Sequence, residues 1–236
     1  WCYGITCVLF LIAMFFYALI RSKPIPKKAV GESFIQSMSV GIKFVFKNKL
    51  VLSALSLDLF AVLFGGAVAL IPAFTDKILH LGPESYGLLR TAPAIGAVLM
   101  AFYLAVKPPA KNAGISLLFG VAAFGVFTIL FAICTNYWLA FAMLLFTGAF
   151  DNISVVVRHS ILQLSTPDEM RGRVAAVNSI FIGSSNEIGA FESGIAARFL
   201  GLVPSIVFGG AMTILVVFGI NKLNPELKNL DLTKLE

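Results

Sequence analysis

Residues 113–133 read AGISLLFGVAAFGVFTILFAI, a run of 21 amino acids without a charged side chain. A helix of roughly 20 apolar residues is long enough to cross the hydrocarbon core of a bilayer. The rest of the chain is similar, because 58% of its 236 residues are hydrophobic and only 13% are charged. Soluble domains typically carry about 25% charged residues. We therefore expect an integral membrane protein.

Further apolar runs of spanning length lie on both sides of this one. The predicted spans are residues 2–20, 50–75, 85–106, 113–133, 137–160, 170–200 and 202–220. Backbone polar groups cannot remain unpaired in lipid, so a spanning segment is a helix or part of a closed barrel. No ten-residue alternation indicates barrel strands. The sequence thus predicts an all-α, polytopic membrane helix bundle with seven spans.

The basic residues collect on one predicted side of the membrane. If residues 21–49 are cytoplasmic, then 14 of the 18 Lys and Arg residues fall in inner loops, as the positive-inside rule requires. They are Arg21, Lys23, Lys27, Lys28, Lys43, Lys47, Lys49, Lys107, Lys111, Arg171, Arg173, Lys222, Lys228 and Lys234. This topology places the carboxyl terminus in the cytoplasm. It also explains the net charge of +6 by contact with anionic lipid, so we expect no nucleic-acid partner.

The chain divides into four predicted segments. Residues 1–20 form one span, 21–49 a basic cytoplasmic linker, 50–221 a bundle of six spans and 222–236 a cytoplasmic tail. Within the linker, apolar residues recur at helical spacing and predict an amphipathic helix on the inner face, with an ordinary loop as the alternative. These residues are Val30, Phe34, Met38, Ile42, Val45 and Phe46.

The inner loop before the sixth span reads STPDEMRGRV, residues 165–174. Thr166 and Glu169 have the spacing of a capping box, with Pro167 at the first helical position, so we expect a helix to begin here. Two interpretations of its charges remain open. They are either a capped helix start with the usual inner basic residues, or a charge network that gates the inner side. The gate candidates are Arg158, Asp168, Glu169, Arg171 and Arg173.

Four acids fall inside predicted spans, namely Asp58, Asp151, Glu187 and Glu192. A charged residue near the centre of a spanning helix costs about 2.5–3.5 kcal/mol on insertion scales. Such residues usually face the bundle interior, pair with one another or line a water-filled path. We therefore take these acids as candidates for a substrate or proton path. The alternative is that they only hydrogen-bond helices together.

Helical geometry sorts the polar residues of the fifth and sixth spans. Asn178, Ser185 and Glu192 are spaced by seven and stack on one helix face, whereas Glu187 lies on nearly the opposite side.

On the fifth span, Asp151 and Arg158 share a face but lie about 10.5 Å apart along the axis. We therefore expect each to find a partner on another helix, and Asn152 is a further polar candidate. Arg90 is expected to extend to the outer surface.

The sequence contains no catalytic constellation. His80 and His159 are too few and too far apart for a metal-protease motif, and no P-loop is present. We therefore predict no catalytic residue, metal site or cofactor, and a protein that is not an enzyme.

The order of these features resembles the carboxyl-terminal half of a major facilitator superfamily transporter, preceded by the last helix of the first half. The matching features are the basic central loop with SMSVGIKFVFKNK, residues 37–49, and the six spans that follow it. Residues 166–201, TPDEMRGRVAAVNSIFIGSSNEIGAFESGIAARFLG, are more narrowly similar to bacterial siderophore exporters, also called transmembrane secretion effectors.

This resemblance implies a secondary transporter of the bacterial inner membrane that works by alternating access. It implies proton-coupled efflux of a siderophore, drug or similar small molecule, with the lipid bilayer and an amino-terminal half as partners. On this basis we expect Asn178, Ser185 and Glu192 to form a polar stripe between the halves, and Glu187 to brace a neighbour through Asn152 or Arg158. The alternatives are a seven-helix receptor or sensor and a non-transporting assembly subunit.

Overall fold

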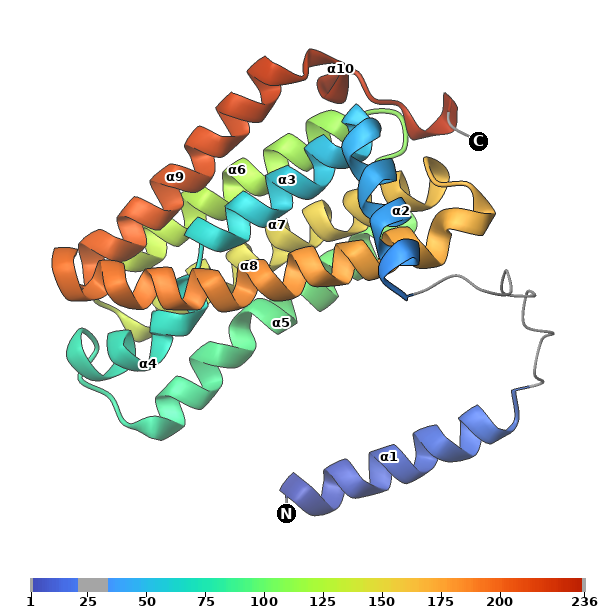
Figure 1. The fold of residues 1–236 in the computed structure, drawn as a ribbon. Helices are drawn as coiled ribbons and strands as arrows, with labels where there is room; N and C mark the ends of the chain where they lie inside the picture. The colour runs from blue at the N-terminus through green and yellow to red at the C-terminus, as the bar shows by residue number, and fades with distance from the viewer. Residues whose placement is uncertain (1, 21–33, 235–236) are drawn as a thin grey trace. The chain divides into compact units, whose positions relative to one another are not determined.

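The computed structural model describes residues 2–20 and 34–234, and these residues form helices joined by short connections, without strands (Figure 1). The chain has two units, Trp1–Phe34 and Ile35–Glu236. The first contains α1 (Cys2–Ala18). The other helices are α2 (Phe34–Lys47), α3 (Lys49–Phe64), α4 (Ala67–Lys77), α5 (Pro83–Val106), α6 (Ala113–Ala132), α7 (Tyr137–Leu164), α8 (Arg171–Leu200), α9 (Leu202–Leu223) and α10 (Pro225–Lys228), with 3-10 turns at Asp168–Met170 and Leu232–Lys234.

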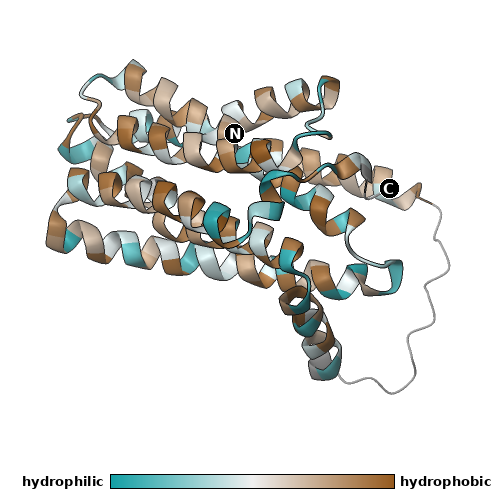
Figure 2. Cartoon of the chain, turned by 90° about the horizontal axis from the view of Figure 1, so that it is seen from above, coloured by the Kyte–Doolittle hydropathy of each residue, from teal (hydrophilic) through white to brown (hydrophobic). Residues whose placement is uncertain are grey.

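The helices have the length and composition of a membrane bundle. Five segments of the described residues are long and apolar enough to span, one of which joins α3 and α4. Hydrophobic residues run along the helices in Figure 2, and large aromatic side chains such as Phe102, Phe199 and Phe218 are 67–80% exposed. These surfaces suit contact with lipid. The predicted all-α polytopic bundle is therefore confirmed.

Two of the seven predicted spans differ from these five. α1 is apolar but has only 17 residues. α8 has 30 residues, about 45 Å of helix, but its many polar side chains lower its hydropathy. Both remain predicted spans.

The second unit is held together by close contacts between helices. α7 packs against α5 and α6, α9 packs against α6 and α3, and α8 packs against α3 and α9 (Figure 1). At the contact of α5 with α7, a Cβ on Gly148 would overlap the backbone of Pro93, and a Cβ on Gly96 would overlap the Leu145 carbonyl. Small residues let membrane helices approach this closely, which gains van der Waals contact where lipid provides no hydrophobic driving force.

The first long span is broken in the middle. α3 ends at Phe64, Gly65 and Gly66 are not helical, and α4 begins at Ala67. Gly65 is required by space, because a Cβ there would overlap the Phe124 ring and lie 2.5 Å from the Ala61 carbonyl oxygen. A Cβ on Gly66 would meet the Ser193 hydroxyl and lie 3.0 Å from the Gly189 carbonyl oxygen. On α8, a Cβ at Gly189 would lie 2.8 Å from the Leu63 carbonyl oxygen. The break is therefore enclosed by neighbouring helices, as non-helical backbone at membrane depth must be.

The start of α8 corrects the predicted capping box. Pro167 is extended (φ −55°, ψ 148°), and a 3-10 turn at Asp168–Met170 precedes the α-helix. Thr166 is buried, but its hydroxyl has no hydrogen-bond partner among the described residues, so it does not cap the helix. Because Pro167 is extended, the Thr166 hydroxyl does not reach the backbone N–H groups from which an N-cap side chain accepts hydrogen bonds.

α2 and the described residues after α9 also pack against the bundle. The predicted amphipathic helix is α2, of which Val45 is fully buried and Gly41 contacts the backbone of Arg173, whereas Val30 lies outside the described residues. In the tail, Leu227 is fully buried and its carbonyl fills the space beside Gly114 on α6. The amide of Leu232 donates to the Ala110 carbonyl at 2.9 Å. Residues 222–234 therefore extend the fold and are not a free tail.

A buried ion pair joins the centre of the bundle. Arg158 on α7 lies 3.2 Å from the Asp58 carboxylate on α3, and the side chains are 3% and 7% exposed. The same guanidinium nitrogen donates to Asn178 Oδ1 on α8 at 2.9 Å. The expectation that Arg158 finds partners on other helices is confirmed. Three helices are thus connected through one guanidinium group.

The close contact of α5 with α7 makes a first prediction. Gly148→Ala places a methyl group in the Pro93 backbone, and overpacking of this kind typically costs about 1–3 kcal/mol. We expect a lower apparent melting temperature in detergent. Gly87→Ala is the matched control, because Gly87 is also helical but has no neighbour within 4 Å. Equal melting temperatures for the two variants would contradict the packing described.

The ion pair makes a second prediction. Asp58→Asn leaves Arg158 buried without a counterion, which typically costs about 3–5 kcal/mol. We expect this variant to lose thermal stability in a detergent melting assay. The double variant Asp58→Leu, Arg158→Met should recover most of the loss, because it removes both buried charges. A single variant as stable as the unmodified protein would show that the pair does not hold the helices together.

Candidate functional site

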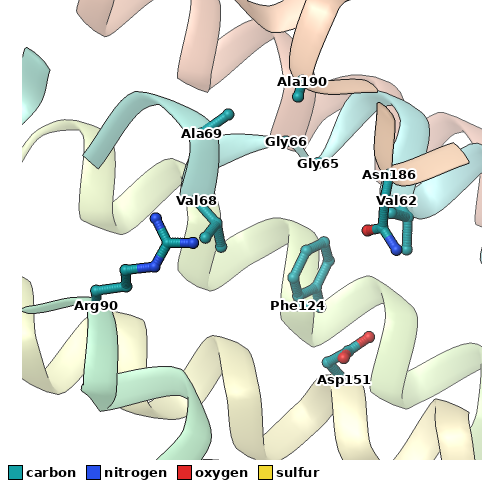
Figure 3. A pocket seen from close by; sticks show the side chains of 10 residues that line it. All are labelled: Val62, Gly65, Gly66, Val68, Ala69, Arg90, Phe124, Asp151, Asn186 and Ala190. Atoms are coloured by element: carbon teal, nitrogen blue, oxygen red, sulfur yellow. The ribbon is translucent and has the colours of Figure 1, made fainter. Parts of the chain in front are cut away.

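A cavity of about 350 Å³ lies at the break between α3 and α4. Its wall contains Gly65 and Gly66 at the break, Arg90 from α5, Phe124 from α6, Asp151 from α7 and Asn186 from α8 (Figure 3). Asp151 and Asn186 lie near the middle of their helices, and the break lies near the middle of residues 49–77. The cavity therefore lies at mid-depth in the predicted membrane, where transporters of broken-helix construction bind their substrates.

Arg90 supplies a positive charge to this cavity. It lies seven residues into α5 and its guanidinium Nη1 donates to the Tyr86 hydroxyl at 2.6 Å. Its guanidinium carbon is 6.0 Å from the centre of the Tyr86 ring. Tyr86 thus orients Arg90 while the other guanidinium donors stay available, because an arginine has five N–H groups. Arg90 is exposed and also lines the cavity, so its extension to the outer surface stays a prediction.

Asp151 supplies the opposite charge. It is partly buried, and among the described residues it forms no ion pair within 4.0 Å. The expected partner on another helix is therefore not present for Asp151, although Arg158 does find one. Arg158 itself lies two turns away on the same face of α7, too far for a direct pair. Asp151 thus lines the cavity without an ion-pair partner among the described residues.

Asn152, the residue beside Asp151, is also without a partner. Its side-chain Oδ1 is buried and accepts no hydrogen bond from the described residues. Ser154, two residues further along α7, has a buried hydroxyl that also lacks a hydrogen-bond partner among the described residues. A buried unpaired polar atom costs about 1–3 kcal/mol. The middle of α7 thus carries polar groups that its neighbours in the bundle do not satisfy.

The predicted polar stripe of α8 lies on a different face from the one expected. Asn178 and Ser185 are 5% and 2% exposed, so they point into this bundle and cannot line an interface with another half. Glu192 is partly buried, next to Ser193. The small side chains of Ser185 and Gly189 let α8 lie directly against α3, and this contact sets the rotation of α8.

Glu187 is likewise placed differently from the expectation. It is exposed, and neither Asn152 nor Arg158 contacts it, because Arg158 is engaged by Asp58 and Asn178. The predicted bracing role is therefore wrong. Glu187 lies on the free face of α8, opposite the face that packs against α3.

The inner-gate candidates do not form one network in this structure. Arg171 pairs with Asp168 at 3.0 Å within the same segment, and both side chains are more than half exposed. Arg173 donates to the Met170 sulfur at 3.8 Å. Glu169 is exposed, and Arg158 is buried in the ion pair described above. A gating role for these residues remains a prediction.

A second cavity of about 280 Å³ opens beside the inner-gate candidates, between α7 and α8. Its wall includes His159, Gln163, Arg171 and Asn178. It lies on the same side of α8 as Asn186 and Ala190 of the first cavity, since residues 175, 179, 186 and 190 follow one helical stripe. The two cavities thus lie along one line from the predicted inner surface to mid-depth.

Sequence reasoning missed part of the cavity wall. Asn186 lies in the same polar stretch as Glu187 but was not among the predicted site residues. Its spacing of four residues from Ala190 places both on one face of α8, and both line the cavity. Phe124 carried no signal, because it is one apolar residue among many in α6. Among the described residues, no three or more His, Cys, Asp or Glu side chains lie close enough together to hold a metal ion.

Comparisons with known proteins agree with this architecture. The family model of the Major Facilitator Superfamily matches residues 1–190. The chain is 23% identical over 222 residues to an uncharacterized MFS-type transporter, YfmI, of Bacillus subtilis (strain 168). This match covers 89% of the present chain and 51% of the relative, so the chain spans about half of that protein. No solved structure matches the chain.

The family model covers most of the chain, including the broken span, the basic linker and α8 as far as Ala190. The chain therefore belongs to the major facilitator superfamily.

Proposed function

We propose that the chain is part of a secondary active transporter that moves a small molecule across the bacterial inner membrane by alternating access. The observation that carries this proposal is the mid-depth cavity at a broken helix, lined by Arg90, Asp151 and Asn186. Family membership favours transport over the receptor and the assembly-subunit alternatives. In this proposal the chain works together with an amino-terminal half of the same transporter, since it spans about half of its relative.

We further propose that transport is efflux coupled to protons, with siderophores and drugs as substrates. Coupling requires an acid that is exposed to water in one state and removed from it in the other, since a carboxylate that loses water binds its proton more tightly. Asp151 meets this description best, because it faces the cavity and has no ion-pair partner among the described residues. Asp58 is less suited, because its negative charge is already balanced by Arg158.

Glu192 is the second candidate for coupling. It is partly buried and its neighbour Ser193 contacts the break at Gly66. The inner-gate candidates Asp168 and Arg171 form an exposed pair at the start of α8, so they would move together with this helix. In this proposal the cavity beside them is the inner approach to the substrate site.

Efflux from liposomes tests this proposal. Full-length protein is reconstituted, and efflux is measured with and without an imposed proton gradient. The probes are enterobactin, a siderophore, ethidium, a cationic dye, and leucine, a zwitterion. We expect gradient-driven efflux of at least one probe. Asp151→Asn should reduce it to the rate measured without a gradient, because an amide cannot carry the proton.

Asp76→Asn is the matched control, since Asp76 is an exposed acid of α4 that lines neither cavity. It should leave gradient-driven efflux unchanged. Glu192→Gln reports on the second candidate in the same assay. Efflux that ignores the gradient in the unmodified protein would exclude proton coupling, and full activity in Asp151→Asn would remove this residue from the coupling step.

A further inference from the structure

The cavity at the break holds one cationic and one anionic side chain that do not neutralise each other. Arg90 and Asp151 both line it, yet no ion pair within 4.0 Å joins them (Figure 3). The Phe124 ring stands between the two side chains in this view. Elsewhere in the bundle, Asp58 and Arg158 show that this chain does pair charges when they are close. The cavity wall therefore carries one cationic and one anionic side chain that are not paired with each other.

A ligand with a single charge fits this arrangement poorly. A cation attracted by Asp151 would meet the Arg90 guanidinium in the same space, and an anion attracted by Arg90 would meet the Asp151 carboxylate. Like charges brought together without water oppose binding strongly. A molecule that carries both charges satisfies both side chains and brings no net charge into the membrane.

The backbone at the break favours the same type of ligand. The carboxyl end of α3 and the amino end of α4 meet at Gly65 and Gly66, both of which line the cavity. A helix carries partial positive charge at its amino end and partial negative charge at its carboxyl end. Gly66 provides no side-chain cap for α4, so the first amides of this helix are not satisfied by a capping side chain. The two helix ends at the break thus add a partial negative and a partial positive charge to the cavity wall.

The rest of the wall limits the size and character of the ligand. Val62, Val68 and Phe124 are apolar, and Asn186 offers both a hydrogen-bond donor and an acceptor. Small-molecule sites usually have volumes of about 300–1,000 Å³, and this cavity of about 350 Å³ is at the small end. An aromatic ring also attracts a cationic nitrogen placed over its face. The wall therefore suits a small molecule, or one part of a larger molecule, with an apolar portion beside its charges.

We propose that this cavity binds a zwitterionic group, with a cationic nitrogen beside Asp151 and a carboxylate or similar anionic group beside Arg90. This assignment names the substrate class and rests on the proposed transport function. α-Amino acids and related inner salts have this chemistry. Asn186 and the apolar side chains then distinguish among zwitterions, while Arg90 and Asp151 select for the two charges.

Binding to the full-length protein in detergent tests the assignment. The probes are glycine, leucine and phenylalanine, each as the free amino acid, as its methyl ester and as its N-acetyl derivative. At neutral pH these forms are a zwitterion, a cation and an anion with the same side chain. Dissociation constants are obtained from the shift of the melting temperature with probe concentration. We expect at least one free amino acid to bind about tenfold or more tightly than its two derivatives.

Two variants separate the roles of the charges. Asp151→Asn should weaken the zwitterion while sparing the N-acetyl anion, and Arg90→Gln should weaken the zwitterion while sparing the methyl ester. Asp76→Asn and Arg198→Gln are exposed controls that should leave all dissociation constants unchanged. The contrast between forms is the readout, so a general loss of stability in a variant does not imitate it.

Three outcomes would overturn the assignment. They are equal binding of the three forms, no binding of any free amino acid, and variants that change all forms alike. The liposome assay keeps this result separate from the proposed function. Gradient-driven efflux of ethidium or enterobactin without selection for zwitterions would leave transport standing and remove the assignment. Selective binding of zwitterions without any efflux would support the binding site and contradict the proposed transport function.

Discussion

A charge inside a membrane protein has to be neutralised or given access to water, and this constraint organises the second unit of the chain. The Asp58–Arg158 pair meets it within the protein, and the bond from Arg158 to Asn178 extends the connection to a third helix. Asp151 shares the same face of α7 but lies two turns from Arg158, too far for a direct pair, and it has no ion-pair partner among the described residues. Asp58 is thus balanced inside the protein, whereas Asp151 remains available in the cavity.

The break between α3 and α4 also depends on the helices that surround it. Two glycines interrupt the helix, but the interruption persists at membrane depth only because α6, α8 and α9 pack directly on the backbone there. Gly189 on α8 lies against the Leu63 carbonyl, and Gly209 on α9 lies against the Phe64 carbonyl. This contact also sets the rotation of α8, which turns Asn178 and Ser185 inward and leaves Glu187 on the free face. One small-residue contact therefore shapes the cavity and assigns the faces of its neighbouring helix.

At the end of the bundle that is predicted to face the cytoplasm, two segments outside the long helices pack against the bundle. α2 rests on the backbone of Arg173 at Gly41, and the segment after α9 returns to α6 with Leu227 fully buried. Both segments thereby contact the ends of helices that line the two cavities. A Cβ on Gly41 would lie 3.0 Å from the Arg173 carbonyl oxygen, so α2 approaches the start of α8 closely. α2 is in this respect part of the bundle.

The sequence by itself determined the membrane class, the helical architecture and the positions of most helices, because spanning length and apolar composition are local properties. It also identified the costly residues, including Asp58, Asp151 and Glu192, since a charge in an apolar run is visible without a structure. It did not determine the partners of these residues, the face that α8 presents, the missing cap at Thr166, or the inclusion of Arg90, Phe124 and Asn186 in one cavity. Those properties depend on the rotation and separation of helices far apart in sequence. Only tertiary packing decides them, because side chains on different helices meet according to which small residues allow close approach.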